Sequence, residues 1–89
     1  MAKVPNPRLR RALLEIVRNQ LRAGNPPETR ATLERLLAQG LPRERVLELI
    51  ACVVASEVVD MVNSDQPYDE ARYLAGLRAL PRLPWEGAG

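Results

Sequence analysis

The stretch PRERVLELIACVVASEVVDMVNS, residues 42–64, decides the fold class of this chain. It is rich in valine and isoleucine, which favour β-strands, but it is too long for one strand and its polar residues recur at helical spacing. At 3.6 residues per turn they gather on one narrow strip and leave the remaining circumference apolar. The strip comprises Arg45, Glu48, Cys52, Ser56, Asp60 and Asn63. We therefore predict a central, largely buried helix over about residues 43–63.

Upstream, residues 7–23 carry apolar side chains at intervals of three and four, which is typical of an amphipathic helix that faces a core. Asn6 is a suitable N-cap, and Pro7 fits the first helical position, where no hydrogen bond is lost. Gly24 ends the segment, because glycine adopts the left-handed conformation at little cost. The sequence predicts the first helix here.

A double proline follows at once, in RAGNPPETRATLERLLAQGLP, residues 22–42. We interpret it as the start of a second helix over about residues 26–39. In this interpretation Asn25 is the N-cap, the two prolines occupy the first turn, and Glu28 reaches back to the backbone N–H of the cap. Gly40 closes the helix.

Downstream, Asp69 is a suitable cap for a fourth helix over about residues 69–80, and Pro81 and Pro84 end it. Residues 1–80 then form one all-α domain, a compact bundle of about four helices with short connections. Residues 81–89 are predicted to form a C-terminal tail, in which Trp85 is an apolar anchor that would fold back onto the domain.

Composition excludes several classes of protein. The 89 residues suffice for one domain, and they include no histidine and a single cysteine, Cys52. The commonest general base and the commonest neutral metal ligand are therefore missing, and no internal disulfide can form. We expect a non-enzymatic protein with no catalytic residues, no metal site and no cofactor. No segment resembles an apolar leader or a membrane span, so we expect a cytoplasmic location and no membrane partner.

Charge is distributed unevenly along the chain. Residues 1–24 have a net charge of +5, and the remainder has a net charge of −3. Four arginines of the first helix fall within about 80° and form what we call the basic ridge: Arg8, Arg11, Arg18 and Arg22. This ridge is a candidate interaction surface. It could hold nucleic-acid phosphates, although neither interleaved aromatic residues nor a glycine-rich phosphate loop accompanies it.

The acidic counterpart lies in residues 57–70, and one of its members stands out. Glu57 falls beside the polar strip of the central helix, not in its middle, so we expect it to be partly buried. A buried carboxylate needs a partner, and the candidates are Arg30 and Arg72 on neighbouring helices. Cys52 is either a reactive thiol on the polar strip or a small packing residue, and the sequence favours packing because no basic group next to it in sequence lowers its pKa.

Three runs of the chain, NPRLRRALLEIVRNQL, PPETRATLERLLAQG and QPYDEARYLAGLRAL, resemble a small bacterial family known only as a domain of unknown function. The resemblance covers about residues 6–80 and implies an all-helical fold without a known activity. Members of that family carry histidines at the positions of Arg10 and Leu14, and a His-Glu-x-x-His-like pair at those of Glu44 and Glu48. This chain offers arginine, leucine and two carboxylates there.

The sequence therefore predicts a helical module that acts through its surface. The favoured partner is a second copy of the chain or another protein. Complementary charged patches favour such association, and dimerisation would bury apolar surface that so small a chain covers poorly alone. The alternative is a nucleic-acid-binding protein that uses the basic ridge.

Overall fold

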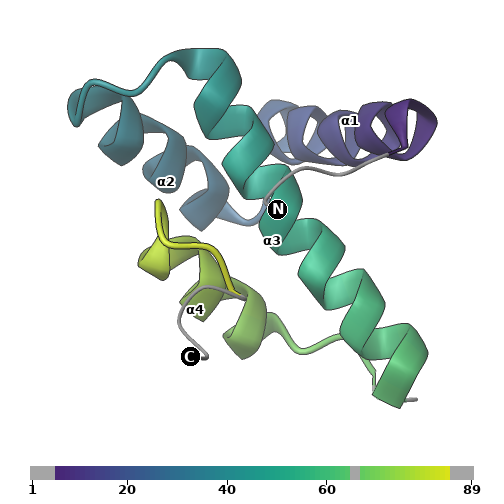
Figure 1. Cartoon of the computed structure of the whole chain (residues 1–89). Helices are drawn as coiled ribbons and strands as arrows, with labels where there is room; N and C mark the ends of the chain where they lie inside the picture. Colours follow the sequence, from purple (N-terminus) through teal and green to yellow (C-terminus); the bar gives the residue numbers. More distant parts are fainter. Residues whose placement is uncertain (1–5, 65–66, 85–89) are drawn as a thin grey trace.

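The part of the chain that the structure describes forms four helices joined by short connections (Figure 1). The computed structural model describes residues 6–64 and 67–84, and within these ranges it contains no β-strand. The helices are α1 (Pro7–Ala23), α2 (Pro27–Ala38), α3 (Arg43–Ser64) and α4 (Glu70–Ala79). The predicted all-α fold is confirmed, and each predicted helix boundary lies within one residue of the observed one.

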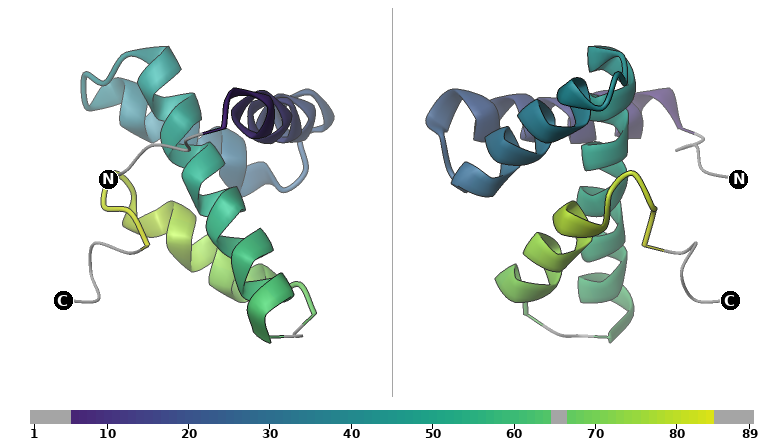
Figure 2. Two further views of the ribbon diagram at one scale, coloured as in Figure 1. Left: turned by 45° about the vertical axis from the view of Figure 1, so that its right-hand side comes forward. Right: turned by 90° about the vertical axis from the view of Figure 1, so that its left-hand side faces the viewer.

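The longest helix, α3, is the axis on which the other three assemble. It contacts α1, α2 and α4. Its first half lies near α1 and α2, and its second half runs beside α4 (Figures 1 and 2). Val46, Ile50 and Val53 of this helix are fully buried, so these strand-favouring residues serve as core residues of a helix.

The polar strip of α3 is less exposed than the sequence suggests. Cys52, predicted on that strip, is buried with 5% of its surface exposed. One turn earlier, Glu48 forms an ion pair with Arg10 of α1. This part of the strip therefore faces α1, with Glu48 still partly exposed, and the buried Cys52 is a packing residue.

The junction between α1 and α2 is where the sequence prediction is wrong. Asn6 and Gly24 bound α1 as expected, with the Asn6 side chain accepting from Arg8 N and Leu9 N, and with Gly24 at φ +65°. Asn25, however, does not cap α2, because its backbone N–H donates to the Gln20 carbonyl (3.1 Å) and so completes the C-terminal cap of α1. Pro26 is the N-cap of α2 and has no N–H that Glu28 could reach.

One aspartate side chain and one arginine side chain fix the two ends of α4. The Asp69 side chain accepts from Arg72 N (3.1 Å), as the sequence predicts. At the other end, Arg35 of α2 donates to the carbonyls of Leu77 (3.0 Å) and Leu80 (2.9 Å). Both carbonyls lie at a helix C-terminus, where a cation is favourable.

The contact between α3 and α4 is close because of one small residue. A Cβ atom added at Gly76 would lie 2.8 Å from Cγ1 of Val53, so glycine allows the two helices to approach. Beyond the helix, Leu80 is buried, and so is Leu83 within the predicted tail. Trp85, the predicted anchor, lies outside the described residues.

A polar cluster lies among the apolar core residues where α1, α2 and α4 meet. Oε1 of Gln20 accepts two hydrogen bonds of 2.8 Å, one from the Thr29 hydroxyl and one from the Tyr73 hydroxyl. Thr29 and Tyr73 are buried. Burial raises the pKa of Tyr73, and the hydrogen bonds to Thr29 and Gln20 oppose this. The cluster links three helices through one side-chain oxygen.

Candidate functional site

The basic ridge of α1 is divided by the tertiary structure. All four of its arginines, Arg8, Arg11, Arg18 and Arg22, are exposed. Arg22 is engaged locally, since its Nη2 lies 3.3 Å from Oε2 of Glu15 and hydrogen-bonds Asn19. Arg18 and Arg22 line a surface pocket, whereas Arg8 and Arg11 do not.

That pocket, which we call the arginine pocket, has a volume of about 430 Å³ and lies between the C-terminal half of α1, the beginning of α2 and the beginning of α3. Its lining comprises Arg18, Leu21, Arg22, Arg30, Arg43, Glu44 and Leu47. Among these described residues four side chains are cationic and one is anionic, which gives them a net charge of +3. The sequence does not reveal it, because Arg30 and Arg43 come from other helices than the ridge.

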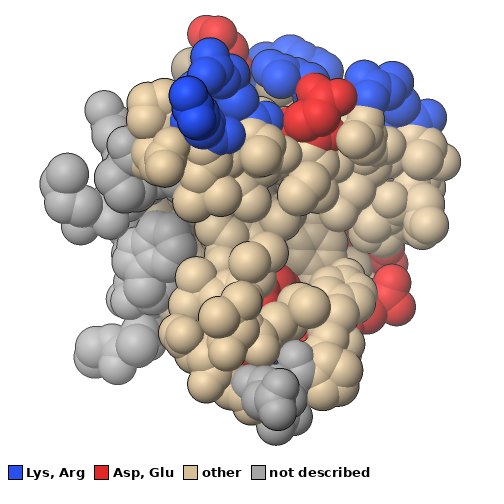
Figure 3. Space-filling view, turned by 90° about the vertical axis from the view of Figure 1, so that its right-hand side faces the viewer, with Lys and Arg blue, Asp and Glu red and all other residues tan. Residues whose placement is uncertain are grey.

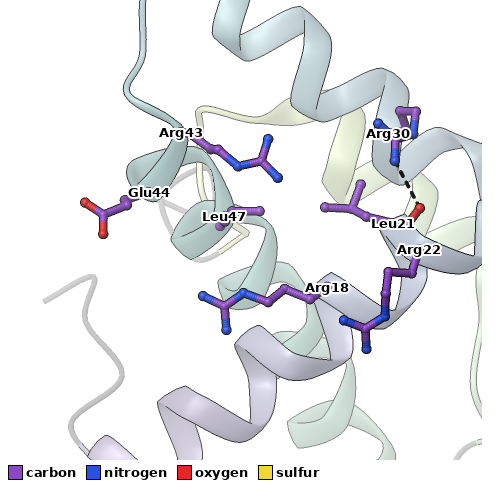
Figure 4. Close-up of a pocket in the computed structure, with 7 residues that line it drawn as sticks. All are labelled: Arg18, Leu21, Arg22, Arg30, Arg43, Glu44 and Leu47. Atoms are coloured by element: carbon purple, nitrogen blue, oxygen red, sulfur yellow. Dashed lines mark hydrogen bonds between the residues drawn. The ribbon is translucent and has the colours of Figure 1, made fainter.

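Figure 4 shows how these side chains lie. Arg43 of α3 and Leu21 of α1 point toward the space between the helices, while the Glu44 carboxylate points away from it. Arg30 donates to the Leu21 carbonyl (3.1 Å), which holds its guanidinium at the edge of the pocket. Leu21 and Leu47 are buried and form the apolar part of the lining.

The buried carboxylate of α3 has one partner among the two arginines that the sequence offers. Glu57 is buried, and Arg72 of α4 meets it with two hydrogen bonds, Nε to Oε2 at 2.7 Å and Nη2 to Oε1 at 3.2 Å. Nε of Arg72 also lies 3.6 Å from Oδ2 of Asp60. The hydrogen bond that Arg72 donates to the Glu57 carboxylate raises the pKa of Arg72. Arg30 is not a partner of Glu57, because it is bound to the Leu21 carbonyl instead.

This ion pair belongs to a second surface depression, of about 480 Å³, between α3 and α4. Glu57, Asp60 and Arg72 line it together with small residues that include Gly76. Its charged groups satisfy one another, and in residues 6–64 and 67–84 no group of three potential metal ligands occurs. The ion pair joins α3 to α4 and therefore has a structural role.

Cys52 is poorly suited to redox or nucleophilic chemistry. Burial raises the pKa of its thiol, Arg45 opposes this, and Glu48 raises it further. The thiolate is the reactive form of cysteine, so a raised pKa makes this thiol less reactive at neutral pH.

An apolar surface lies at the C-terminal end of α3. We call it the α3 apolar face, and it consists of Val58, Val59, Met61 and Val62, all exposed. Val62 is 75% exposed and Val59 is 52% exposed. Their spacing places them on one side of the helix. Leu9 and Ile16 add exposed apolar side chains on α1.

Figure 3 shows the side of the molecule toward which the C-terminal end of α3 projects in Figure 1. Uncharged side chains form most of this side, with basic side chains gathered along its top edge. Exposed apolar side chains that gather on one side of a helix, as Val58, Val59, Met61 and Val62 do, commonly mark an interaction site. Sequence reasoning missed the α3 apolar face because the helical pattern cannot tell which part of an apolar helix its neighbours leave uncovered.

None of the described helices combines the length and the hydrophobicity that crossing a membrane requires. Comparison of the chain with protein-family models, with curated proteins and with solved structures gives no match. The resemblance to an uncharacterised helical family therefore stays a prediction.

Proposed function

We propose that this chain is a non-enzymatic helical module that associates with a second copy of itself through the α3 apolar face. The observation that carries the proposal is the exposure of four apolar side chains on the last three turns of α3, namely Val58, Val59, Met61 and Val62. Burying a valine side chain fully is worth about 1.5–3 kcal/mol. A second copy can supply that burial.

Symmetry makes a copy of the same chain a suitable partner. In a two-fold interface the same patch meets itself, so one apolar face on a single helix is sufficient for both sides. A helix end that projects beyond its neighbours, as α3 does in Figure 1, can lie antiparallel to its equivalent without a clash between the two cores.

Charge supports this pairing. The basic ridge lies on α1, while the exposed acids Asp69 and Glu70 follow the C-terminal end of α3. An antiparallel arrangement of two copies brings the acidic end of each toward the basic helix of the other. Complementary patches of this kind steer association and fix its register.

The buried ionisable groups support a role without catalysis. Glu57 is held by two hydrogen bonds from Arg72, and the raised pKa of Cys52 keeps the thiol protonated. Every fully buried side-chain nitrogen or oxygen of the described residues has a hydrogen-bond partner. These groups stabilise the fold.

Sedimentation equilibrium tests the proposal. We expect the average mass of the wild type to rise with concentration from the 9.9 kDa of one chain toward twice that value. The double variant V59E/V62E should stay at the mass of one chain, because opposed carboxylates repel and cannot be buried. Both positions are exposed, so the fold of one chain should survive, which far-UV circular dichroism checks.

The control is L37E, which places one carboxylate on an exposed leucine of α2. It should associate like the wild type. A wild type that stays at the mass of one chain at millimolar concentration, or a V59E/V62E variant that associates like the wild type, would contradict the proposal.

A further inference from the structure

We propose that the arginine pocket is a binding site for a small anion that carries a diphosphate group. This inference is independent of self-association, since it concerns the beginning of α3 and not its end. Three helices contribute to the site: Arg18 and Arg22 come from α1, Arg30 from α2 and Arg43 from α3. Residues that are far apart in the chain thus present guanidinium groups to one space of about 430 Å³.

Of the four arginines that line this pocket, Arg22 alone has an ionic partner among the described residues, namely Glu15. Within the described part of the chain, Arg18 and Arg43 form neither an ion pair nor a side-chain hydrogen bond. Arg30 uses a donor of Nη2 for the Leu21 carbonyl and keeps others available. Glu44 is the one acid of the lining, and its carboxylate points away from the arginines (Figure 4). A bound polyanion would relieve the repulsion among these cations.

Arginine is also the residue that suits phosphate oxygens. Its planar guanidinium presents parallel N–H donors that match two oxygens of one phosphate. Two linked phosphates offer enough oxygens for several guanidinium groups at once. The apolar side chains of Leu21 and Leu47 provide a surface on which the organic part of such a ligand could lie, as in most small-molecule sites.

The concave shape favours a compact ligand over a nucleic-acid strand. A strand would follow the whole basic ridge, but Arg8 and Arg11 lie outside the pocket, whereas Arg30 and Arg43, which are not part of the ridge, line it. Binding in the pocket and binding along the ridge therefore depend on different arginines, so single arginine variants can distinguish the two modes of binding.

Isothermal titration calorimetry with inorganic pyrophosphate at low salt is the test. We expect R18Q and R43Q each to weaken pyrophosphate binding about tenfold, because each removes charge-assisted hydrogen bonds to the anion. The matched control R8Q removes an exposed arginine of the same ridge outside the pocket. It should change the affinity less than about twofold, because solvent and salt screen a distant exposed charge. Circular dichroism verifies that each variant is folded.

Two further titrations complete the design. ADP should bind the same site, with the same sensitivity to R43Q, and binding tighter than that of pyrophosphate identifies a nucleotide as the source of the diphosphate. A short single-stranded oligonucleotide should bind more weakly than pyrophosphate. The proposal is overturned if pyrophosphate does not bind, if R8Q weakens it as much as R43Q does, or if the oligonucleotide binds most tightly and R8Q weakens it as much as R18Q does.

Discussion

The hydroxyl of Tyr73 donates a 2.8 Å hydrogen bond to Oε1 of Gln20, which connects α4 to α1. No Cα atom of α1 lies within 8 Å of a Cα atom of α4, so these two helices are joined by side chains and not by close packing of their backbones. The Thr29 hydroxyl shares the same oxygen. The partly buried side chain of Gln20 therefore links three helices, of which α1 and α4 are distant in sequence.

Replacing Gln20 by alanine should lower the free energy of unfolding by about 2 kcal/mol, because the substitution removes the oxygen that accepts from the buried hydroxyls of Thr29 and Tyr73. Urea unfolding followed by circular dichroism measures this. The control N19A, at an exposed neighbouring position, should change stability by less than about 0.5 kcal/mol. The all-apolar variant Q20L/T29V/Y73F should recover most of the loss, and equal effects of Q20A and N19A would show that the cluster contributes nothing.

Replacing Gly76 by alanine should destabilise the protein, although alanine is the better helix former by about 1 kcal/mol. The new Cβ would lie 2.8 Å from Cγ1 of Val53, and Val53 is buried and β-branched, so it cannot rotate away easily. Overpacking of this kind costs about 1–3 kcal/mol. In a V53A background, which removes the clashing atom, the same G76A substitution should be neutral or stabilising. Destabilisation of equal size in both backgrounds would contradict the close α3–α4 contact.

Removing the guanidinium of Arg35 should loosen α4. The variant R35M keeps an apolar stem but loses both hydrogen bonds to the carbonyls of Leu77 and Leu80. We expect a loss of about 1–2 kcal/mol, together with faster hydrogen exchange of the α4 amides. R78M removes an exposed arginine from the last turn of the same helix, and its effect should be below about 0.5 kcal/mol. Comparable losses in the two variants would mean that only the charge near the helix end matters.

Stability should fall in alkali. Burial raises the pKa of Tyr73 and of Cys52 above their ordinary values, so the folded chain keeps protons that the unfolded chain releases. The unfolded state then binds fewer protons, and the free energy of unfolding decreases with rising pH, by at most about 1.4 kcal/mol per pH unit for each group. The decrease should begin near pH 8.5 for Cys52 and near pH 10 for Tyr73, with no contribution from either group at lower pH.

Urea unfolding between neutral pH and about pH 10.5 separates the two groups. The variant C52A should lose the first part of the decrease. Y73F should reduce the second part, to which Tyr68 also contributes because burial raises its pKa as well. A decrease that is identical in the wild type and in Y73F would exclude Tyr73 as its source.

Local signals explain why the helices could be predicted. Asn6 and Asp69 act within three residues of their own position, and Gly24 adopts the positive φ for which glycine is suited. Asn25 failed as a cap for a related reason. Its N–H completes the end of α1, and a sequence pattern cannot show which of two adjacent helices uses a residue that could serve either.

Tertiary contacts decided what the sequence left open. The choice between Arg30 and Arg72 as the partner of Glu57 depended on which helix lies beside the second half of α3. The arginine pocket needed Arg18, Arg30 and Arg43 from three helices. Likewise, Val59 and Val62 are exposed because α4 lies against the other side of this half of α3, where Arg72 meets Glu57 and Asp60, and the apolar pattern of α3 does not specify which side is covered.

The most direct test of self-association through the α3 apolar face is an isotope-filtered NOE experiment. Chains with labelled valine methyl groups are mixed with unlabelled chains at millimolar concentration, so that every filtered NOE arises between two chains. We predict NOEs from the methyl groups of Val59 and Val62, and none from the buried methyl groups of Val46. A folded sample without intermolecular NOEs, or with NOEs that arise only from other parts of the surface, would contradict the account.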